Sequence, residues 1–160
     1  MEEMIVQNNN MNNNMNNNMN NIHDNIHDNK SIEDLIDLTL LTKFEFDIAV
    51  LFYKMCKNEY KTTLKQSKSD ATLTTWHIFK NEKWEKETKK NILEKIKSVL
   101  NNLYENKIDL LVIELDTLTN DNINYQKKKI LIAGKILNKL KKEYFIKNIM
   151  KESAELFYSE

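Results

Sequence analysis

The stretch TLTTWHIFKNEKWEK (residues 72–86) decides the fold class, because strand-forming residues lie on both sides of a short polar break. Trp76 and Ile78 alternate with His77 and Phe79, and this period of two is typical of a strand with two different faces. The polar break KNEK then predicts a turn into a second strand. The stretch therefore predicts a hairpin.

A third strand is predicted just before this hairpin, so that residues 60–66, 72–79 and 83–88 form a small antiparallel sheet. Three short strands are marginal alone and need helices packed against one face. We therefore expect a mostly helical α+β domain in which helices pack on a small three-stranded antiparallel sheet.

The remaining chain has the helical period. Ser31 with Asp34 three residues later is a capping box, which predicts a helix through Leu41. Further helices are expected over residues 44–58, 89–118, about 130–144 and 145–158, with a loop over 119–124. Their predicted apolar faces include the following residues: Phe44, Ile48, Leu51, Phe52, Met55, Ile92, Ile96, Leu100, Ile130, Ala133, Leu137, Leu140, Tyr144, Phe145, Ile149 and Leu156.

Residues 1–30 form a separate segment that is rich in asparagine and low in complexity. Its few methionines cannot bury enough apolar area to offset the cost of ordering the backbone, so we expect a disordered tail before an α+β domain at 31–160. His23 and His27 have the spacing of two zinc ligands on a helix, but no third ligand or rigid frame accompanies them. We predict no metal site and no cofactor.

Composition excludes several function classes. The chain of 160 residues contains one glycine and no proline, so it has neither a Walker phosphate loop nor a dinucleotide-binding fingerprint. A single cysteine, Cys56, excludes an internal disulfide framework. No apolar run reaches the length of a membrane span, and no signal core begins the chain. The expectation is an intracellular, non-secreted protein without a membrane partner.

Two features indicate nucleic-acid binding. Aromatic and basic side chains interleave in the predicted hairpin, and such surfaces stack unpaired bases while holding phosphates. The lysine excess lies further on: residues 127–151 hold nine lysines and one acid. The predicted contacts with single-stranded or forked DNA are Trp76, Phe79, Lys80, Lys83, Trp84, Lys127, Lys128, Lys135 and Lys142. The alternative is that both tryptophans attach the sheet to the helices and that the lysines form a solvated face.

Two patterns in this order resemble a known family. Trp76, Phe79 and Trp84 match a W-x-x-F-x-x-x-x-W element. A second match near the end of the chain comprises Leu140, Lys141, Phe145, Ile149, Met150, Lys151, Glu152, Leu156 and Phe157. Together they resemble the segment that precedes the helicase domain in viral and phage primase–helicases, including the poxvirus-type nucleoside triphosphatases of nucleocytoplasmic large DNA viruses.

The resemblance implies an accessory, DNA-handling module of a viral primase–helicase that takes part in DNA replication. It covers residues 44–160 and includes neither the Walker motifs of the ATPase nor the primase carboxylates, so we expect a fragment or a separate copy without the motor. Whether the chain is an enzyme stays open, because the family hydrolyses nucleoside triphosphates while this chain shows no catalytic constellation.

The implied partners are a helicase motor domain or further copies of the chain, in the host cytoplasm or a viral factory. A composition rich in asparagine and free of arginine fits a giant virus. The alternative function is a helical interaction or oligomerisation module that binds no nucleic acid.

Overall fold

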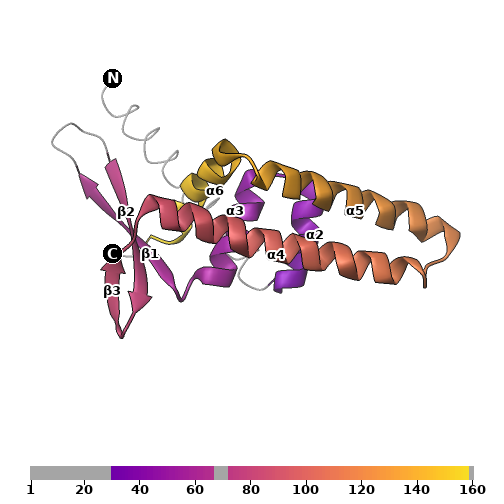
Figure 1. Cartoon of the computed structure of the whole chain (residues 1–160), viewed down its shortest axis with the longest axis horizontal. Helices are drawn as coiled ribbons and strands as arrows, with labels where there is room; N and C mark the ends of the chain where they lie inside the picture. Colours follow the sequence, from indigo (N-terminus) through magenta and orange to yellow (C-terminus); the bar gives the residue numbers. More distant parts are fainter. Residues whose placement is uncertain (1–29, 67–71, 159–160) are drawn as a thin grey trace, which may run out of the picture.

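The structure, a computed structural model, describes residues 30–66 and 72–158. It confirms the predicted α+β class, with helices and a small antiparallel sheet (Figure 1). The elements in chain order are α2 (Ile32–Thr42), α3 (Glu45–Cys56), β1 (Tyr60–Gln66), β2 (Thr72–Lys80), β3 (Lys83–Lys86), α4 (Lys89–Leu115), α5 (Asn120–Leu140) and α6 (Glu143–Leu156). The expected Asn-rich tail and the pair His23 and His27 lie outside the described residues.

The helix starts follow from capping residues in the sequence. The predicted capping box is present: the Ser31 side chain accepts from the backbone N–H of Asp34, and the Asp34 carboxylate accepts from the backbone N–H of Ser31. Hydrogen bonds from the Ser31 hydroxyl first, and then from its backbone N–H, lower the pKa of Asp34. Thr88 caps α4 in the same way by accepting from Asn91.

The sheet has the order β1-β2-β3 and is antiparallel throughout. A two-residue turn joins β2 to β3, with Lys80 paired with Lys83 across it. Asn81 and Glu82 have φ values of 50° and 62°, the left-handed backbone that tight hairpins require. Because the turn holds only two residues, it fixes the register and places Phe79 opposite Trp84.

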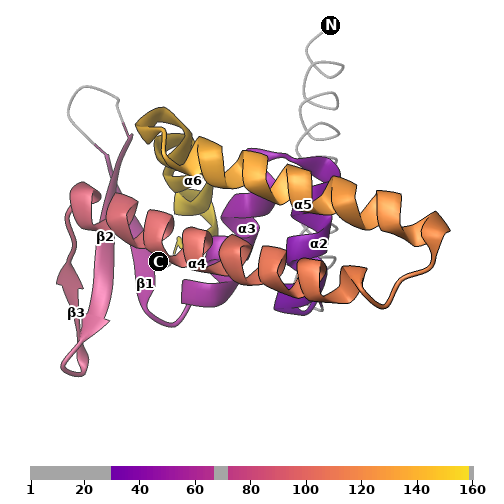
Figure 2. The ribbon, with the colours of Figure 1, turned by 45° about the vertical axis from the view of Figure 1, so that its right-hand side comes forward.

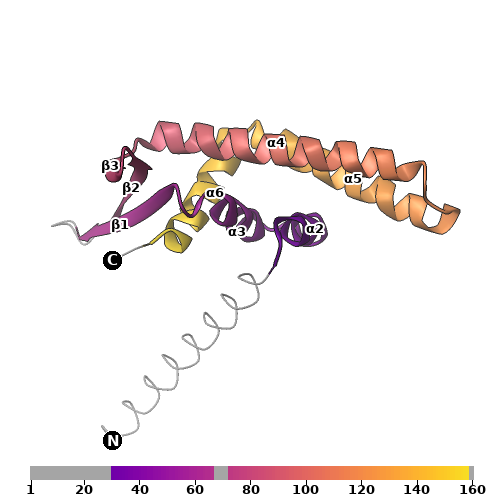
Figure 3. The ribbon, with the colours of Figure 1, turned by 90° about the horizontal axis from the view of Figure 1, so that it is seen from below.

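The sheet lies at one end of an elongated molecule, and the turn between α4 and α5 lies at the other (Figures 1 and 2). The two long helices form a hairpin, with α2, α3 and α6 on one side of it (Figure 3). Gln126 ties α5 to α4 by donating to Glu114 Oε2 at 2.6 Å. No helix among the described residues is long and apolar enough to cross a membrane.

Phe157 joins the sheet to the helices. Its ring packs against four other aromatic rings, from α3, β1 and β2: Phe52, Tyr53, Tyr60 and Trp76, at centroid distances of 5.6, 5.0, 6.4 and 5.2 Å. Its carbonyl also accepts from the N–H of Thr62, and the Thr62 hydroxyl donates to the carbonyl of Ala154. The end of α6 is therefore attached to strand β1 by both packing and hydrogen bonds.

A buried lysine links α4 to α2. Lys107 of α4 is 6% exposed and forms ion pairs with Glu33 and with Asp37, the latter at 3.0 Å. Burial alone would lower its pKa, but the hydrogen bonds and charges of the two carboxylates outweigh burial and raise it. Lys129 of α5 also contacts Asp37, at 3.2 Å, so that one carboxylate of α2 binds both long helices.

Several local predictions are wrong. The expected loop over 119–124 is shorter, because α5 begins at Asn120 after Thr119 as its N-cap. Packing against α4 compensates for the weak helix propensity of these asparagines. Phe44, Met55 and Tyr144 were expected on apolar faces but are 67%, 39% and 58% exposed. They lie at or near helix ends, where no neighbouring element covers them.

Candidate nucleic-acid interface

The hairpin β2–β3 presents an exposed aromatic pair. Phe79 and Trp84 face each other across the strands, with ring centroids 5.1 Å apart and planes inclined by 54°. They are 47% and 40% exposed, respectively, although large aromatic side chains usually find a place in the core. The register of the hairpin fixes this pair, since the short turn at Asn81 and Glu82 places the two rings opposite each other.

A lysine lies beside this pair. The ammonium of Lys61 in β1 is 4.7 Å from the centroid of the Trp84 ring, which is within cation–π distance. Lys61 pairs with His77 in β2, and His77 pairs with Lys86 in β3, so these three side chains share the face of Phe79 and Trp84. This face, defined by Lys61, His77, Phe79, Trp84 and Lys86, is called here the aromatic–lysine face.

A hollow of about 240 Å³ extends this surface toward the end of the chain. Lys57, Lys61, Trp84 and Tyr158 are among its lining residues, and the lining contains no acidic residue. Lys57 and Tyr158 were not predicted from the sequence, because they lie far from the hairpin along the chain. The parallel bridge between Thr62 and Tyr158 brings the end of the chain beside β1.

Trp76 does not belong to this surface. It is 3% exposed and packs on Phe157, so neither face of its indole is free for a nucleotide base. The reason is the alternation of the strand, which turns Trp76 to the side of the helices and Phe79 away from them. For Trp76 the predicted binding role is therefore wrong, and the alternative of a side chain that attaches the sheet to the helices is right.

Lys80 and Lys83 also differ from the prediction. The same alternation places them on the opposite face from Phe79 and Trp84. Each has an acidic partner, Lys80 with Glu87 at 3.7 Å and Lys83 with Glu85 at 3.1 Å. Hydrogen bonding from Thr88 first, and then from Asn91 and the charge of Lys80, lowers the pKa of Glu87. The lysines that lie on the same face as the two exposed rings are Lys61 and Lys86, and not Lys80 and Lys83 as predicted.

The predicted lysines beyond the sheet form a second group. Lys127, Lys128 and Lys135 lie on α5, and Lys142 is the N-cap of α6; all four are exposed and make no ion pair with another described residue. Lys127 and Lys128 lie in the part of α5 near its turn with α4, far from the sheet (Figures 1 and 3). The structure thus does not gather the predicted binding residues: Phe79 and Trp84 lie on one face of the sheet, Lys80 and Lys83 lie on the other, and these four lysines lie on or beside the helices.

No nucleophile or metal centre emerges from the described part of the chain. Burial raises the pKa of the Cys56 thiol to about 11, so it carries almost no thiolate at neutral pH. His77 accepts or donates a hydrogen bond at 3.0 Å with the hydroxyl of Thr63. Among residues 30–66 and 72–158, no group of three or more metal-ligating side chains comes together.

No protein-family model matches the chain, and no curated protein matches its sequence.

Proposed function

We propose that this protein binds single-stranded nucleic acid with the aromatic–lysine face, as a DNA-handling accessory module of a viral primase–helicase. The observation that supports binding is the exposed pair Phe79 and Trp84 with the ammonium of Lys61 over the indole. Unpaired bases stack on such rings whatever their sequence, and lysines beside the rings hold the phosphates. The helicase context rests on the sequence resemblance alone.

The test is a titration of the full chain into fluorescein-labelled oligo-dT, followed by anisotropy at several salt concentrations. Replacing Trp84 with leucine is expected to weaken binding about 5- to 150-fold, because one base stack contributes about 1–3 kcal/mol. The control is Tyr144→Leu, which removes another exposed aromatic ring, on α6, that is 58% exposed against 40% for Trp84.

A second pair of variants separates the two faces of the sheet. Lys61→Ala should weaken binding and reduce its salt dependence, whereas Lys83→Ala on the opposite face should change little. Absence of binding at low salt, or equal effects of Trp84→Leu and Tyr144→Leu, would contradict the proposal.

A second function is favoured by a different observation. Leu41, Ile113 and Leu131 are 72%, 68% and 66% exposed, and all three lie away from the sheet. Apolar side chains rimmed by charge are typical of protein-interaction surfaces. We therefore also propose that the helical part of the molecule, with α2, α4 and α5, is an interaction module. It can operate with or without nucleic acid at the sheet.

A further inference from the structure

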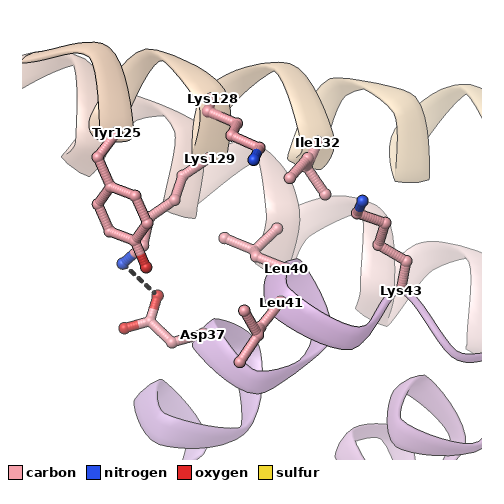
Figure 4. Close-up of a pocket in the computed structure, with 8 residues that line it drawn as sticks. All are labelled: Asp37, Leu40, Leu41, Lys43, Tyr125, Lys128, Lys129 and Ile132. Carbon is pink, nitrogen blue, oxygen red and sulfur yellow. Dashed lines mark hydrogen bonds and ion pairs between the residues drawn. The ribbon is translucent and has the colours of Figure 1, made fainter.

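A small groove lies between α2 and α5 (Figure 4). It has a volume of about 100 Å³, enough for one aliphatic side chain, and Leu40 and Ile132 are among its lining residues. The side chains of Lys43 and Lys128 reach over it from the two helices, on either side of Ile132 in Figure 4. Leu41, 72% exposed, and Tyr125, 59% exposed, extend its apolar surface.

The groove carries uncompensated positive charge. Its one acid, Asp37, is already held by Lys107 at 3.0 Å and Lys129 at 3.2 Å. Lys43 and Lys128 have no ion pair with another described residue. The groove therefore fits an occupant that combines an aliphatic side chain with carboxylates.

The outer surface of α4 of this chain combines aliphatic side chains with carboxylates in this way, so a second copy could supply the occupant. The exposed residues that share this helical face are Glu105, Asp109, Val112, Ile113 and Asp116 just after the helix. Val112 and Ile113 are 48% and 68% exposed, and the three acids form no ion pair with a described residue. No lysine occurs between residues 108 and 126, so this face, called here the acidic stripe, keeps its negative charge.

We propose that copies of this chain associate by seating the acidic stripe of one copy in the α2–α5 groove of another. Ile113 would enter the groove between Lys43 and Lys128, with Asp109 and Asp116 placed beside the two ammonium groups. The contact joins two different surfaces, so it is heterologous and forms a ring or a chain of copies. The inference rests on the interaction function proposed above and is independent of nucleic acid at the sheet.

The groove favours a protein over a nucleic acid. Its lining includes the aliphatic side chains of Leu40, Leu41 and Ile132, which give a base no flat ring on which to stack. Its one aromatic lining residue, Tyr125, has no second ring beside it among the lining residues, unlike the pair Phe79 and Trp84 of the sheet. An aliphatic side chain flanked by carboxylates satisfies both the shape and the charge.

Sedimentation velocity of the full chain over a range of concentrations tests the proposal. The wild type should associate, and less so as salt rises from about 50 to 500 mM, because exposed charges are screened. Asp109→Lys and Lys128→Glu should each weaken association about tenfold or more by placing like charges in contact. An equimolar mixture of the two variants should associate again, since each supplies the surface that the other needs, and so should the double variant.

Lys97→Glu is the control, since it makes the same charge change at an exposed lysine of α4 away from both surfaces. A wild type that stays monomeric at all concentrations, or a mixture that fails to recover, would overturn the proposal. If the chain is monomeric but binds poly-L-glutamate, and Lys128→Glu weakens this binding, self-association is also overturned. The groove would then bind an acidic partner protein, and the proposed interaction function would stand. Binding of oligo-dT that depends on Lys128 in a monomeric chain would instead assign the groove to nucleic acid.

Discussion

Trp76 and Trp84 come from one hairpin and from one sequence motif, yet Trp76 lies in the core and Trp84 lies on the surface. Trp76 is 3% exposed and packs on Phe157, whereas Trp84 is 40% exposed and packs on Phe79 and Lys61. Residue type and local strand pattern are the same for both. The difference is which face of the sheet the helices cover, and that depends on Phe157 at the distant end of the chain.

The comparison predicts a large difference in stability. Trp76→Ala should lower the free energy of unfolding by about 3–5 kcal/mol, because it removes a buried aromatic side chain and leaves a cavity. Trp84→Ala should lower it by less than about 1 kcal/mol, since half-exposed rings contribute little burial. Urea unfolding followed by circular dichroism measures both. Equal losses would show that the two faces of the sheet do not differ as described.

The reactivity of Cys56 sharpens the contrast between covered and open regions. Burial raises the pKa of its thiol from 9.0 to about 11. At pH 8 the folded chain therefore has about one hundredth of the thiolate that an unburied Cys56 would have. Iodoacetamide should therefore label Cys56 at least about 100-fold more slowly in the folded chain than in urea. Mass spectrometry of timed samples gives the rates. Fast labelling of the folded chain would mean that α3 is not buried at this end.

Lys107 tests the contact between α4 and α2, away from the sheet. Lys107→Ala should cost about 1–3 kcal/mol, because it leaves Glu33 and Asp37 without their buried cation. Lys107→Met keeps the apolar stem in place and should cost less.

The two lysine variants also predict a pH dependence. The pKa of Lys107 lies above its ordinary value of 10.5, so its contribution is complete below that pH and is lost as pH rises through the folded-state value. The stability difference between wild type and Lys107→Met should therefore shrink above about pH 10.5. A difference that is constant up to pH 12 would contradict the ion pair.

The smallest expected effect concerns the turn between the two strands. Glu82 has a φ of 62°, which glycine adopts without strain. Glu82→Gly should raise stability by about 0.5–1 kcal/mol and leave Phe79 opposite Trp84. Thermal unfolding and tryptophan fluorescence check these two points. A loss of stability would mean that Glu82 has a role beyond the turn.

Much of the fold could be predicted from local patterns. The capping box at Ser31, the three strands and the long apolar stripe of α4 are properties of neighbouring residues, and the structure confirms them. The start of α5 could not be predicted, because its asparagines are poor helix formers and only packing against α4 makes them helical. The predicted binding set was separated for a similar reason, since adjacent residues of a strand point to opposite faces.

The sequence by itself determined most of the secondary structure, the aromatic residues of the hairpin and the excess of lysine near the end of the chain. Only the tertiary structure decided that Trp76 is core and Trp84 surface, that Lys61 lies beside Trp84, and that Lys127 and Lys128 are far from the sheet. The physical reason is that strand and helix periods are local, whereas coverage of a face depends on contacts between residues such as Trp76 and Phe157, which are distant along the chain.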